Sequence, residues 1–481
     1  MDFVVKVFAM LSLNILLNCF LALSLNVNAA AMLKRDDDQN NYIYANLTDS
    51  DNSFLIDLSV GSDSQNVSVI VDTGSSDLWF PSNDNPYCQN SSSNTTEISS
   101  DDQIDCSEYY SFNPSNSDTF HKNGTEFKGE YGDDVIADGY YGQDSISIAG
   151  VDLPTVNFAV SNLTNSTYGH LGLGYPIMEA AENVTSDYEY TTFLQQLVDD
   201  GKILQPAYSL YLNPDAPKIL FGAIDKKKIN GPLYELYIVP TQLINGDDVG
   251  TLTNIAISMN HLSYMNGDNT NVIGGGYYPV VLNSALDYHV FPKDFVDAIS
   301  QSLNLEYSEE DYYYIDCSEI QEGNFLIAFQ GAEFDVPATS FFQEIVNEDN
   351  RGTGVCYFNV EQTDNEFITM GSQFLQNFYT VVNLHQNKIG LAYAAEANDE
   401  DIEVIENDIG DTVYPEYDDH YGKDHSTFSF FDHETLSFSE TASYSAPAQT
   451  ASSTTSTRNV GAVAQKSTSL SVIAILFSLL F

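Results

Sequence analysis

Basic residues are scarce in this chain. Its 481 residues include 16 Lys and Arg against 69 Asp and Glu, which gives a formal net charge of −53. A field of this sign repels nucleic acid and anionic lipid surfaces and keeps a protein soluble, so no nucleic-acid partner is expected. It also suits an acidic exterior, where many carboxylates would be partly protonated and their mutual repulsion would fall.

Cysteine is scarce as well, with five residues. Cys19 falls in an apolar N-terminal run, which leaves Cys88, Cys106, Cys317 and Cys356. An even number in a secreted chain predicts two disulfides, and four cysteines allow three connectivities. The histidines lack metal-ligand spacing, so no metal and no cofactor are expected.

Long hydrophobic runs are confined to the two ends of the chain. Lys6 and the apolar run Val7–Leu25 lead to small residues at 27–29, so residues 1–29 are expected to be a signal peptide, with a membrane anchor as the alternative. The apolar tail Leu470–Leu480 is shorter than the ~20 residues that span a bilayer. Small residues around Asn459 precede it, so residues 460–481 are predicted to be a GPI-anchor signal that is removed on attachment at Asn459. Both ends predict a mature protein on the outside of a cell.

Three further features concern processing. Residues 30–35 end in Lys34-Arg35 and are predicted to be a short pro-segment, although an exposed basic pair is the alternative. Residues 396–459 are acidic and then Ser/Thr-rich, which predicts a disordered stalk because they offer little apolar surface to bury. Asn-X-Ser/Thr sequons predict glycosylation at Asn46, Asn66, Asn90, Asn94, Asn123, Asn162, Asn165 and Asn183.

The middle of the chain reads as closely spaced strands. Alternating apolar residues at Phe54–Val60 and Val67–Val71, with a turn between them, predict an antiparallel hairpin. Helical patterns are few, at Thr191–Asp200 and Pro292–Leu303. This pattern predicts an all-β, mostly antiparallel fold.

Two segments carry the chemistry. The first, VSVIVDTGSSDLWFP, places Asp72 after an apolar run and before Thr73-Gly74-Ser75. The second, VVLNSALDYHVFP, places Asn283 nine residues before Pro292. Each is followed by a short apolar segment with glycine, at 169–173 and 368–371 respectively, which suggests two equivalent halves.

The first segment resembles the first active-site loop of the pepsin-type aspartic proteases, and the second resembles their other loop with Asn283 in place of the second Asp. The resemblance covers about Tyr44 to Ala395 and narrows to the yapsins, fungal cell-surface proteases. It implies a bilobal fold with a central cleft, an N-terminal lobe at 36–210 and a C-terminal lobe at 211–395, and a monomer.

The segment FKGEYGDDVIADGYYGQDSI matches the yapsin flap, the hairpin that covers the cleft. By this resemblance Tyr131 is the flap tyrosine, and Gly132 and Asp133 belong to the substrate-binding part of the flap. The resemblance also favours disulfides within each half, Cys88–Cys106 and Cys317–Cys356. Expected partners are peptide or protein segments with Lys or Arg, the GPI lipid and cell-wall glucan.

Asn283 decides the functional expectation. Aspartic proteases use two carboxylates that share one proton, and an amide cannot exchange protons near neutral pH. The positions after it also depart from the family pattern. Ala285 adds a Cβ where a positive φ is expected, Leu286 removes a hydroxyl, and Asp287 is a weak substitute carboxylate. We expect a catalytically impaired protein that still binds peptides; the alternative is an active endopeptidase that cleaves near basic residues at acidic pH.

Overall fold

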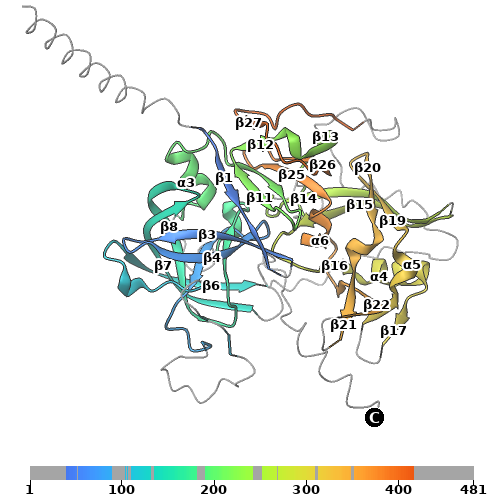
Figure 1. Cartoon of the computed structure of the whole chain (residues 1–481), viewed down its shortest axis with the longest axis horizontal. Helices are drawn as coiled ribbons and strands as arrows, with labels where there is room; N and C mark the ends of the chain where they lie inside the picture. Colours follow the sequence, from blue (N-terminus) through green and yellow to red (C-terminus); the bar gives the residue numbers. More distant parts are fainter. Residues whose placement is uncertain are drawn as a thin grey trace, which may run out of the picture. The chain divides into compact units, whose positions relative to one another are not determined.

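The computed structural model describes residues 40–50, 52–88, 103–104, 106, 110–131, 135–180, 190–241, 252–267, 269–308, 312–347 and 351–415. All elements below belong to the unit that begins at Tyr42. Strands dominate it (Figure 1), which confirms the expected all-β fold. The predicted signal peptide, pro-segment and anchor signal lie outside the described residues. Within those residues no helix is long and apolar enough to cross a membrane.

The N-terminal lobe is built on an eight-stranded sheet in the order β2-β3-β4-β9-β5-β8-β7-β6, drawn blue to cyan in Figure 1. The expected hairpin is present as β3 and β4, whose antiparallel register runs from Leu55 opposite Ile70 to Val60 opposite Gln65. Strands β6 and β7 form the flap hairpin. The strands are β2 (Thr48–Ser50), β3 (Ser53–Val60), β4 (Gln65–Asp72), β5 (Leu78–Pro81), β6 (His121–Tyr131), β7 (Val135–Ile148), β8 (Val151–Thr164) and β9 (Gly169–Gly172).

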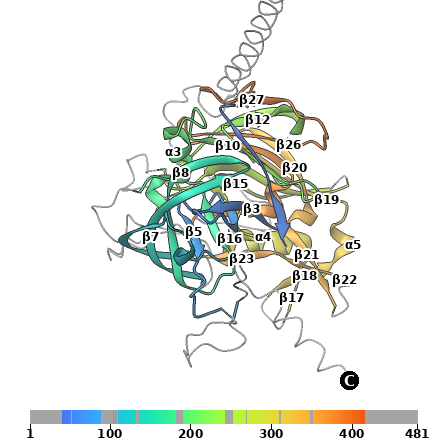
Figure 2. The same cartoon turned by 60° about the vertical axis from the view of Figure 1, so that its left-hand side comes forward.

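The C-terminal lobe is built on a seven-stranded sheet in the order β20-β19-β14-β15-β24-β16-β23. A four-stranded sheet, β17-β18-β22-β21, belongs to the same lobe and is seen in Figure 2. The strands are β14 (Ala256–Asn266), β15 (Asn269–Leu282), β16 (His289–Pro292), β17 (Glu306–Tyr307), β18 (Tyr313–Asp316), β19 (Gly323–Phe329), β20 (Ala332–Pro337), β21 (Phe342–Val346), β22 (Gly352–Phe358), β23 (Val360–Thr363) and β24 (Ile368–Met370).

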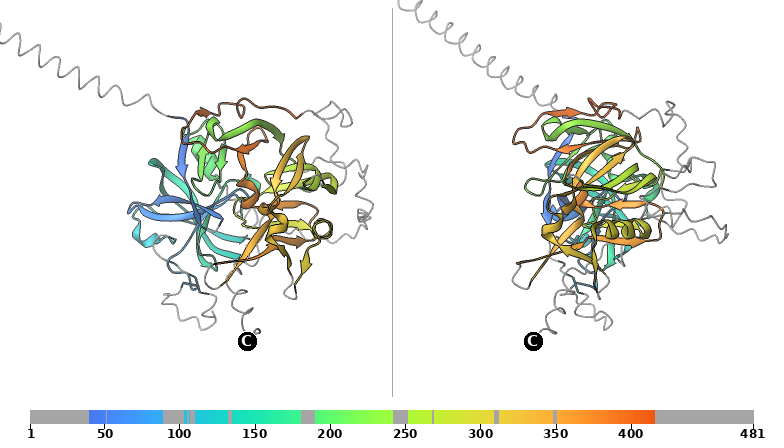
Figure 3. Two further views of the ribbon diagram at one scale, coloured as in Figure 1. Left: turned by 45° about the vertical axis from the view of Figure 1, so that its right-hand side comes forward. Right: turned by 90° about the vertical axis from the view of Figure 1, so that its right-hand side faces the viewer.

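A six-stranded sheet contains strands from both halves of the sequence, in the order β1-β11-β10-β25-β26-β13. Green and orange strands, far apart in sequence, therefore lie together in Figure 3. The expected lobe boundary after residue 210 falls inside β10, so it does not separate the sheets. The strands are β1 (Ile43–Asn46), β10 (Ala207–Tyr211), β11 (Lys218–Phe221), β13 (Ile229–Tyr237), β25 (Phe378–Asn383) and β26 (Lys388–Ala394).

Residues 396–415 of the acidic segment contain a strand and buried side chains, which corrects the expected start of the stalk at residue 396. Strand β27 (Ile402–Val404) pairs antiparallel with β12 (Ala223–Asp225), and the two are labelled side by side in Figures 1 and 2. Ile405 and Ile409 are 1% and 0% exposed, and Lys226 forms an ion pair with Glu403. Two buried isoleucines and a strand pairing offset the chain entropy that the acidic composition alone cannot.

Helices are few and short, as expected. Helix α4 presents Phe295, Val296 and Ile299 to the core at helical spacing and ends at Asn304, which adopts the left-handed conformation that often closes helices. The helices are α3 (Phe193–Asp199), α4 (Lys293–Leu303), α5 (Cys317–Ile320) and α6 (Ser372–Leu375), with 3₁₀ turns η2 (Pro114–Asn116), η3 (Pro176–Met178), η4 (Lys226–Lys228) and η5 (Ala338–Phe341). Helices α3 and α4 confirm the two predicted helical segments.

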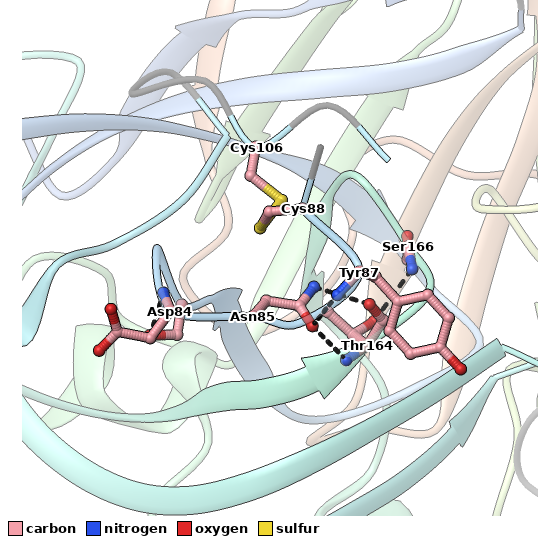
Figure 4. Close-up of a disulfide and its surroundings, with 8 residues drawn as sticks. Asp84, Asn85, Tyr87, Cys88, Cys106, Thr164 and Ser166 are labelled. Carbon is pink, nitrogen blue, oxygen red and sulfur yellow. Dashed lines mark hydrogen bonds between the residues drawn. A yellow bond between two sulfur atoms is a disulfide. The ribbon is translucent and has the colours of Figure 1, made fainter. Parts of the chain in front are cut away.

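Both expected disulfides are present, one in each lobe. Cys88 bonds to Cys106 and Cys317 bonds to Cys356, so the sequence-local connectivity is confirmed. Figure 4 shows the first bridge beside Asn85, whose amide donates to the Thr164 carbonyl and whose oxygen accepts from the Thr164 N–H. These bonds tie the disulfide-bearing loop to the end of β8.

The sequons divide into three groups. The side chains of Asn46, Asn66, Asn123 and Asn162 are exposed, as a glycosylated asparagine must be. Asn165 is half-buried and accepts a hydrogen bond from the Ile136 N–H. Asn90, Asn94 and Asn183 lie outside the described residues, so glycosylation stays a prediction at all eight positions.

Candidate active site

The two candidate loops occupy equivalent places in their lobes. Strand β4 ends at Asp72 and runs parallel to β9, with Asp72 opposite Gly172. Strand β15 ends just before Asn283 and runs parallel to β24, with Leu282 opposite Met370. Each partner strand also pairs antiparallel with the strand that follows its loop. The internal repetition seen in the sequence is therefore a structural repeat.

The two loops are joined by reciprocal hydrogen bonds. The Thr73 hydroxyl donates to the Leu282 carbonyl at 2.7 Å, and the Ser284 hydroxyl donates to the Val71 carbonyl at 2.6 Å. The backbone N–H of each residue donates to the hydroxyl of the other, at 3.1 and 3.0 Å. Because all four groups are buried, these bonds fix the position of one loop against the other.

Asp72 is 3% exposed and accepts hydrogen bonds on both carboxylate oxygens. The Gly74 N–H donates to Oδ1 at 2.7 Å, and the Ser75 hydroxyl donates to Oδ2 at 2.5 Å. The His170 imidazole contacts Oδ2 through Nδ1 at 2.8 Å. Burial alone would raise the pKa of Asp72, but these three partners outweigh it and lower that pKa below its ordinary value. These partners therefore favour the ionised form of Asp72.

Asn283 occupies the equivalent place in the second loop and is 5% exposed. The Ala285 N–H donates to its Oδ1 at 2.9 Å, as the Gly74 N–H does to Asp72. Since a backbone N–H can only donate, the amide oxygen must face Ala285 and the NH₂ group must face the other way. A Cβ at Gly74 would lie 2.3 Å from this NH₂ nitrogen. The second loop thus presents an amide donor beside the first loop, with no ionisable group on Asn283.

One expectation about the second loop is wrong. Ala285 was expected to require a positive φ, but neither Ala285 nor Gly74 has one. The Ala285 methyl packs with Leu55 and Ile70 in a small apolar cluster. Gly74 is needed for close approach to Asn283 and not for its backbone angle, so the expected strain at Ala285 is absent.

Leu286 and Asp287, the two residues after Ala285, do not replace the groups that surround Asp72. Leu286 stands where Ser75 stands in the first loop, is buried, and offers no hydroxyl to Asn283. The Asp287 carbonyl accepts a hydrogen bond from the Asn359 side-chain amide at 2.7 Å. Burial raises the pKa of Tyr357, and the charge of Asp287 adds to that rise. Asn283 and not Asp287 is the counterpart of Asp72, because its Oδ1 accepts from the Ala285 N–H as Asp72 Oδ1 accepts from the Gly74 N–H.

His170 is the site residue that sequence reasoning missed. It lies in β9 opposite Ile70 and is 2% exposed, in a Gly-His-Leu-Gly run that was noted only as an apolar partner of the Asp72 loop. Its Nε2 is buried and has no hydrogen-bond partner among the described residues. The signal in the sequence was the single titratable side chain in an otherwise apolar run.

The flap tyrosine lies against this histidine. Tyr131 ends β6, is 7% exposed, and its ring centroid lies 4.7 Å from that of His170. The Trp79 ring lies 5.4 Å from both His170 and Tyr131. The rings of Trp79, Tyr131 and His170 therefore form one aromatic cluster next to Asp72. Gly132 and Asp133 lie outside the described residues, so their expected roles stay predictions.

A second buried carboxylate supports the first loop from behind. Asp77 is 2% exposed; it accepts hydrogen bonds from the Tyr141 hydroxyl at 2.6 Å and the Ala180 N–H at 2.9 Å. Burial outweighs these bonds and raises the pKa of Asp77 to about 6. The described residues contain no group of three or more His, Cys, Asp or Glu side chains that could hold a metal ion.

Comparison with known proteins agrees with this geometry. The model of the eukaryotic aspartyl protease family matches residues 53–394. The chain is 32% identical to aspartic proteinase MKC7 of Saccharomyces cerevisiae over 78% of this chain and 71% of the relative. It is 30% identical to aspartic proteinase 3 of the same yeast, over 93% and 89%, and 29% identical to aspartic proteinase yapsin-3, over 81% and 75%. The paired loops and these matches show that the chain belongs to the eukaryotic aspartyl protease family.

Proposed function

We propose that this chain is a cell-surface, yapsin-like aspartic protease homologue whose hydrolytic activity is weak or lost and which still binds peptides. The observation that carries the proposal is the amide of Asn283 in the place equivalent to the Asp72 carboxylate, oriented by the Ala285 N–H. In the two-carboxylate mechanism the ionised group takes a proton from water and the protonated group donates to the scissile carbonyl. Asn283 can donate a hydrogen bond to that carbonyl but cannot give up a proton.

The size of the defect follows from the lost proton transfer. General acid–base catalysis contributes about 10²–10⁴-fold, so turnover of basic-residue peptides is expected to be at least ~100-fold below that of an active relative. The test measures kcat/KM at acidic pH for the parent, Asp72→Ala and an active family member. Turnover within tenfold of the active member, abolished by Asp72→Ala, would refute impairment.

That refuting outcome is the alternative function, an active endopeptidase that cleaves near basic residues. A specific observation favours keeping it: the first loop retains a buried Asp72 with a full set of hydrogen-bond donors and a lowered pKa. The same assay separates the two, because only the alternative predicts hydrolysis that depends on Asp72.

Peptide binding is the second part of the proposal. The flap strands β6 and β7 are paired, and Asp133 lies two residues after Tyr131 in the sequence. A carboxylate there would pair with Lys or Arg of the peptide, on a protein with a net charge of −53. A Lys peptide should bind the parent more tightly than Asp133→Asn at fixed salt. Equal affinities would leave only the overall acidic field.

The surface location is the third part. The apolar tail after Asn459 supports a GPI anchor, at the membrane or transferred to wall glucan. The two disulfides agree with a secretory route. A phosphatidylinositol-specific phospholipase, or a glucanase if the protein is bound to the wall, should release the mature chain. Finding Leu470–Phe481 in the mature chain would disprove the anchor.

A further inference from the structure

His170 makes a direct contact with the carboxylate on which any aspartic protease chemistry here would depend. Its Nδ1 lies 2.8 Å from Asp72 Oδ2, and both side chains are almost fully buried. The Ser75 hydroxyl donates to the same oxygen at 2.5 Å. A carboxylate oxygen has two lone pairs for hydrogen bonds, so Oδ2 is fully used by the protein.

Asp72 Oδ1 is also partly used, because it accepts from the Gly74 N–H. A water molecule that is to lose its proton needs a free lone pair on this carboxylate within hydrogen-bond reach. Oδ2 can offer one only if His170 or Ser75 moves away. Gly74 and Ser75 leave one lone pair open on each oxygen, and the contact with His170 occupies the one on Oδ2, so that only Oδ1 can still accept from water.

The ring cluster around His170 opposes such a movement. Trp79 is stacked on the imidazole with an interplanar angle of 13°, and Tyr131 lies at 38° with a centroid distance of 4.7 Å. Tyr131, which packs against the imidazole, ends the flap strand β6, so a movement of His170 would disturb the packing of the flap.

The second lobe provides a comparison within the same chain. In β24, Thr369 pairs with Val281 of β15 and Val290 of β16, as His170 in β9 pairs with Ile70 of β4 and Trp79 of β5. Thr369 is therefore the structural equivalent of His170. Its hydroxyl is buried and has no partner among the described residues, so it does not cap Asn283. The equivalent position in the second lobe thus holds a small side chain, and of the two residues only His170 hydrogen-bonds to the residue at the end of its partner loop.

We propose that His170 is a positioning residue that caps the Asp72 carboxylate, so that the site carries two independent blocks to proteolysis, Asn283 and His170. This inference rests on the proposed impairment and extends it. Restoring the second carboxylate alone would then leave Asp72 paired with the imidazole. Activity would return only when both positions are changed.

The test is a double-mutant cycle on the full-length protein. The variants are Asn283→Asp, His170→Thr and the double variant, with His170→Leu as a second replacement that fills more of the vacated space. We expect the double variant to exceed Asn283→Asp by at least ~10-fold in kcat/KM, with His170→Thr alone inactive. Thr369→Val in the Asn283→Asp background is the matched control and should leave the activity unchanged, because the Thr369 hydroxyl has no hydrogen-bond partner among the described residues.

Two readouts separate capping from a merely structural effect. His170 is one of the three partners that lower the pKa of Asp72, so the acid limb of the pH–rate profile should lie at higher pH in the double variant than in Asn283→Asp. Asp72, Tyr131 and Trp79 face the imidazole, and the negative charge of Asp77 lies close enough to affect Tyr131. The variants leave all four residues in place. In the parent labelled at histidine, NMR should show a downfield Nδ1 proton that persists in Asn283→Asp and disappears in His170→Thr.

Each outcome decides the inference. Activity of Asn283→Asp within threefold of the double variant would overturn the cap while leaving the proposed impairment intact. Double variants that fold but are inactive would also overturn the proposed cap. So would the absence of a hydrogen-bonded Nδ1 proton in the parent. An active parent would refute the proposed impairment, whereas the ratio of the two repaired variants would still measure the effect of His170.

Discussion

Replacement of Asp77 by Asn should make the protein more stable at neutral pH and leave it unchanged at acidic pH. Burial raises the pKa of Asp77 to about 6 from an ordinary value of 3.8. Because the folded-state pKa is raised, the native state holds a proton that the unfolded state has already released. Stability is therefore greatest below about pH 4 and falls as the pH rises to about 6.

The magnitude follows from the size of that shift. About two pKa units at 1.36 kcal/mol each give a cost of about 3 kcal/mol for the ionised carboxylate at pH 7. The amide introduced by Asp77→Asn would be neutral and of the same shape as the carboxylate. Its oxygen would accept from the Ala180 N–H, and its NH₂ group would donate to the Tyr141 hydroxyl, which can accept as well as donate.

The assay is guanidinium unfolding of the parent and Asp77→Asn at pH 4 and pH 7. We expect a gain of up to about 3 kcal/mol at pH 7 and a difference near zero at pH 4. Asp63→Asn is the control for the removal of one negative charge, because Asp63 is exposed. A loss at pH 7 would show that the Tyr141 and Ala180 bonds outweigh burial. A gain that is equal at the two pH values would show that it does not come from the titration of Asp77.

Three other predictions concern buried groups near or far from the site. Burial lowers the pKa of His289 to about 4, so the stability that depends on a neutral His289 is fully present above about pH 6.5 and is lost as the pH falls toward 4. His289→Gln should therefore make the free energy of unfolding fall less between pH 6.5 and pH 4. An unchanged dependence on pH would contradict this prediction. Gly74→Ala should lower the melting temperature far more than Ala285→Gly, because a Cβ at Gly74 would lie 2.3 Å from Asn283; similar effects of the two would refute the close approach. Ile409→Ala should cost about 2–5 kcal/mol in denaturant unfolding, whereas a negligible cost would mean that the segment after Ala395 does not pack in solution.

The local pattern of the sequence determined much of this molecule. Alternating apolar residues predicted the β3–β4 hairpin, and helical spacing predicted α3 and α4. The two loops were recognised from the residues around Asp72 and Asn283, and the disulfide pairs from the family resemblance. These features depend on residues close in sequence, or on motifs short enough to be read directly.

Only the tertiary structure decided the features that join distant segments. The contact of His170 with Asp72 spans 98 residues and depends on the parallel register of β9 against β4. The role of Gly74 depends on Asn283 from the other half of the chain. The acidic residues 396–415 pack on the fold because β27 pairs with β12 and because Ile405 and Ile409 are buried, which the overall composition of the segment does not reveal. Strand register and burial are properties of the partners a segment meets, so a pattern read along one segment cannot contain them.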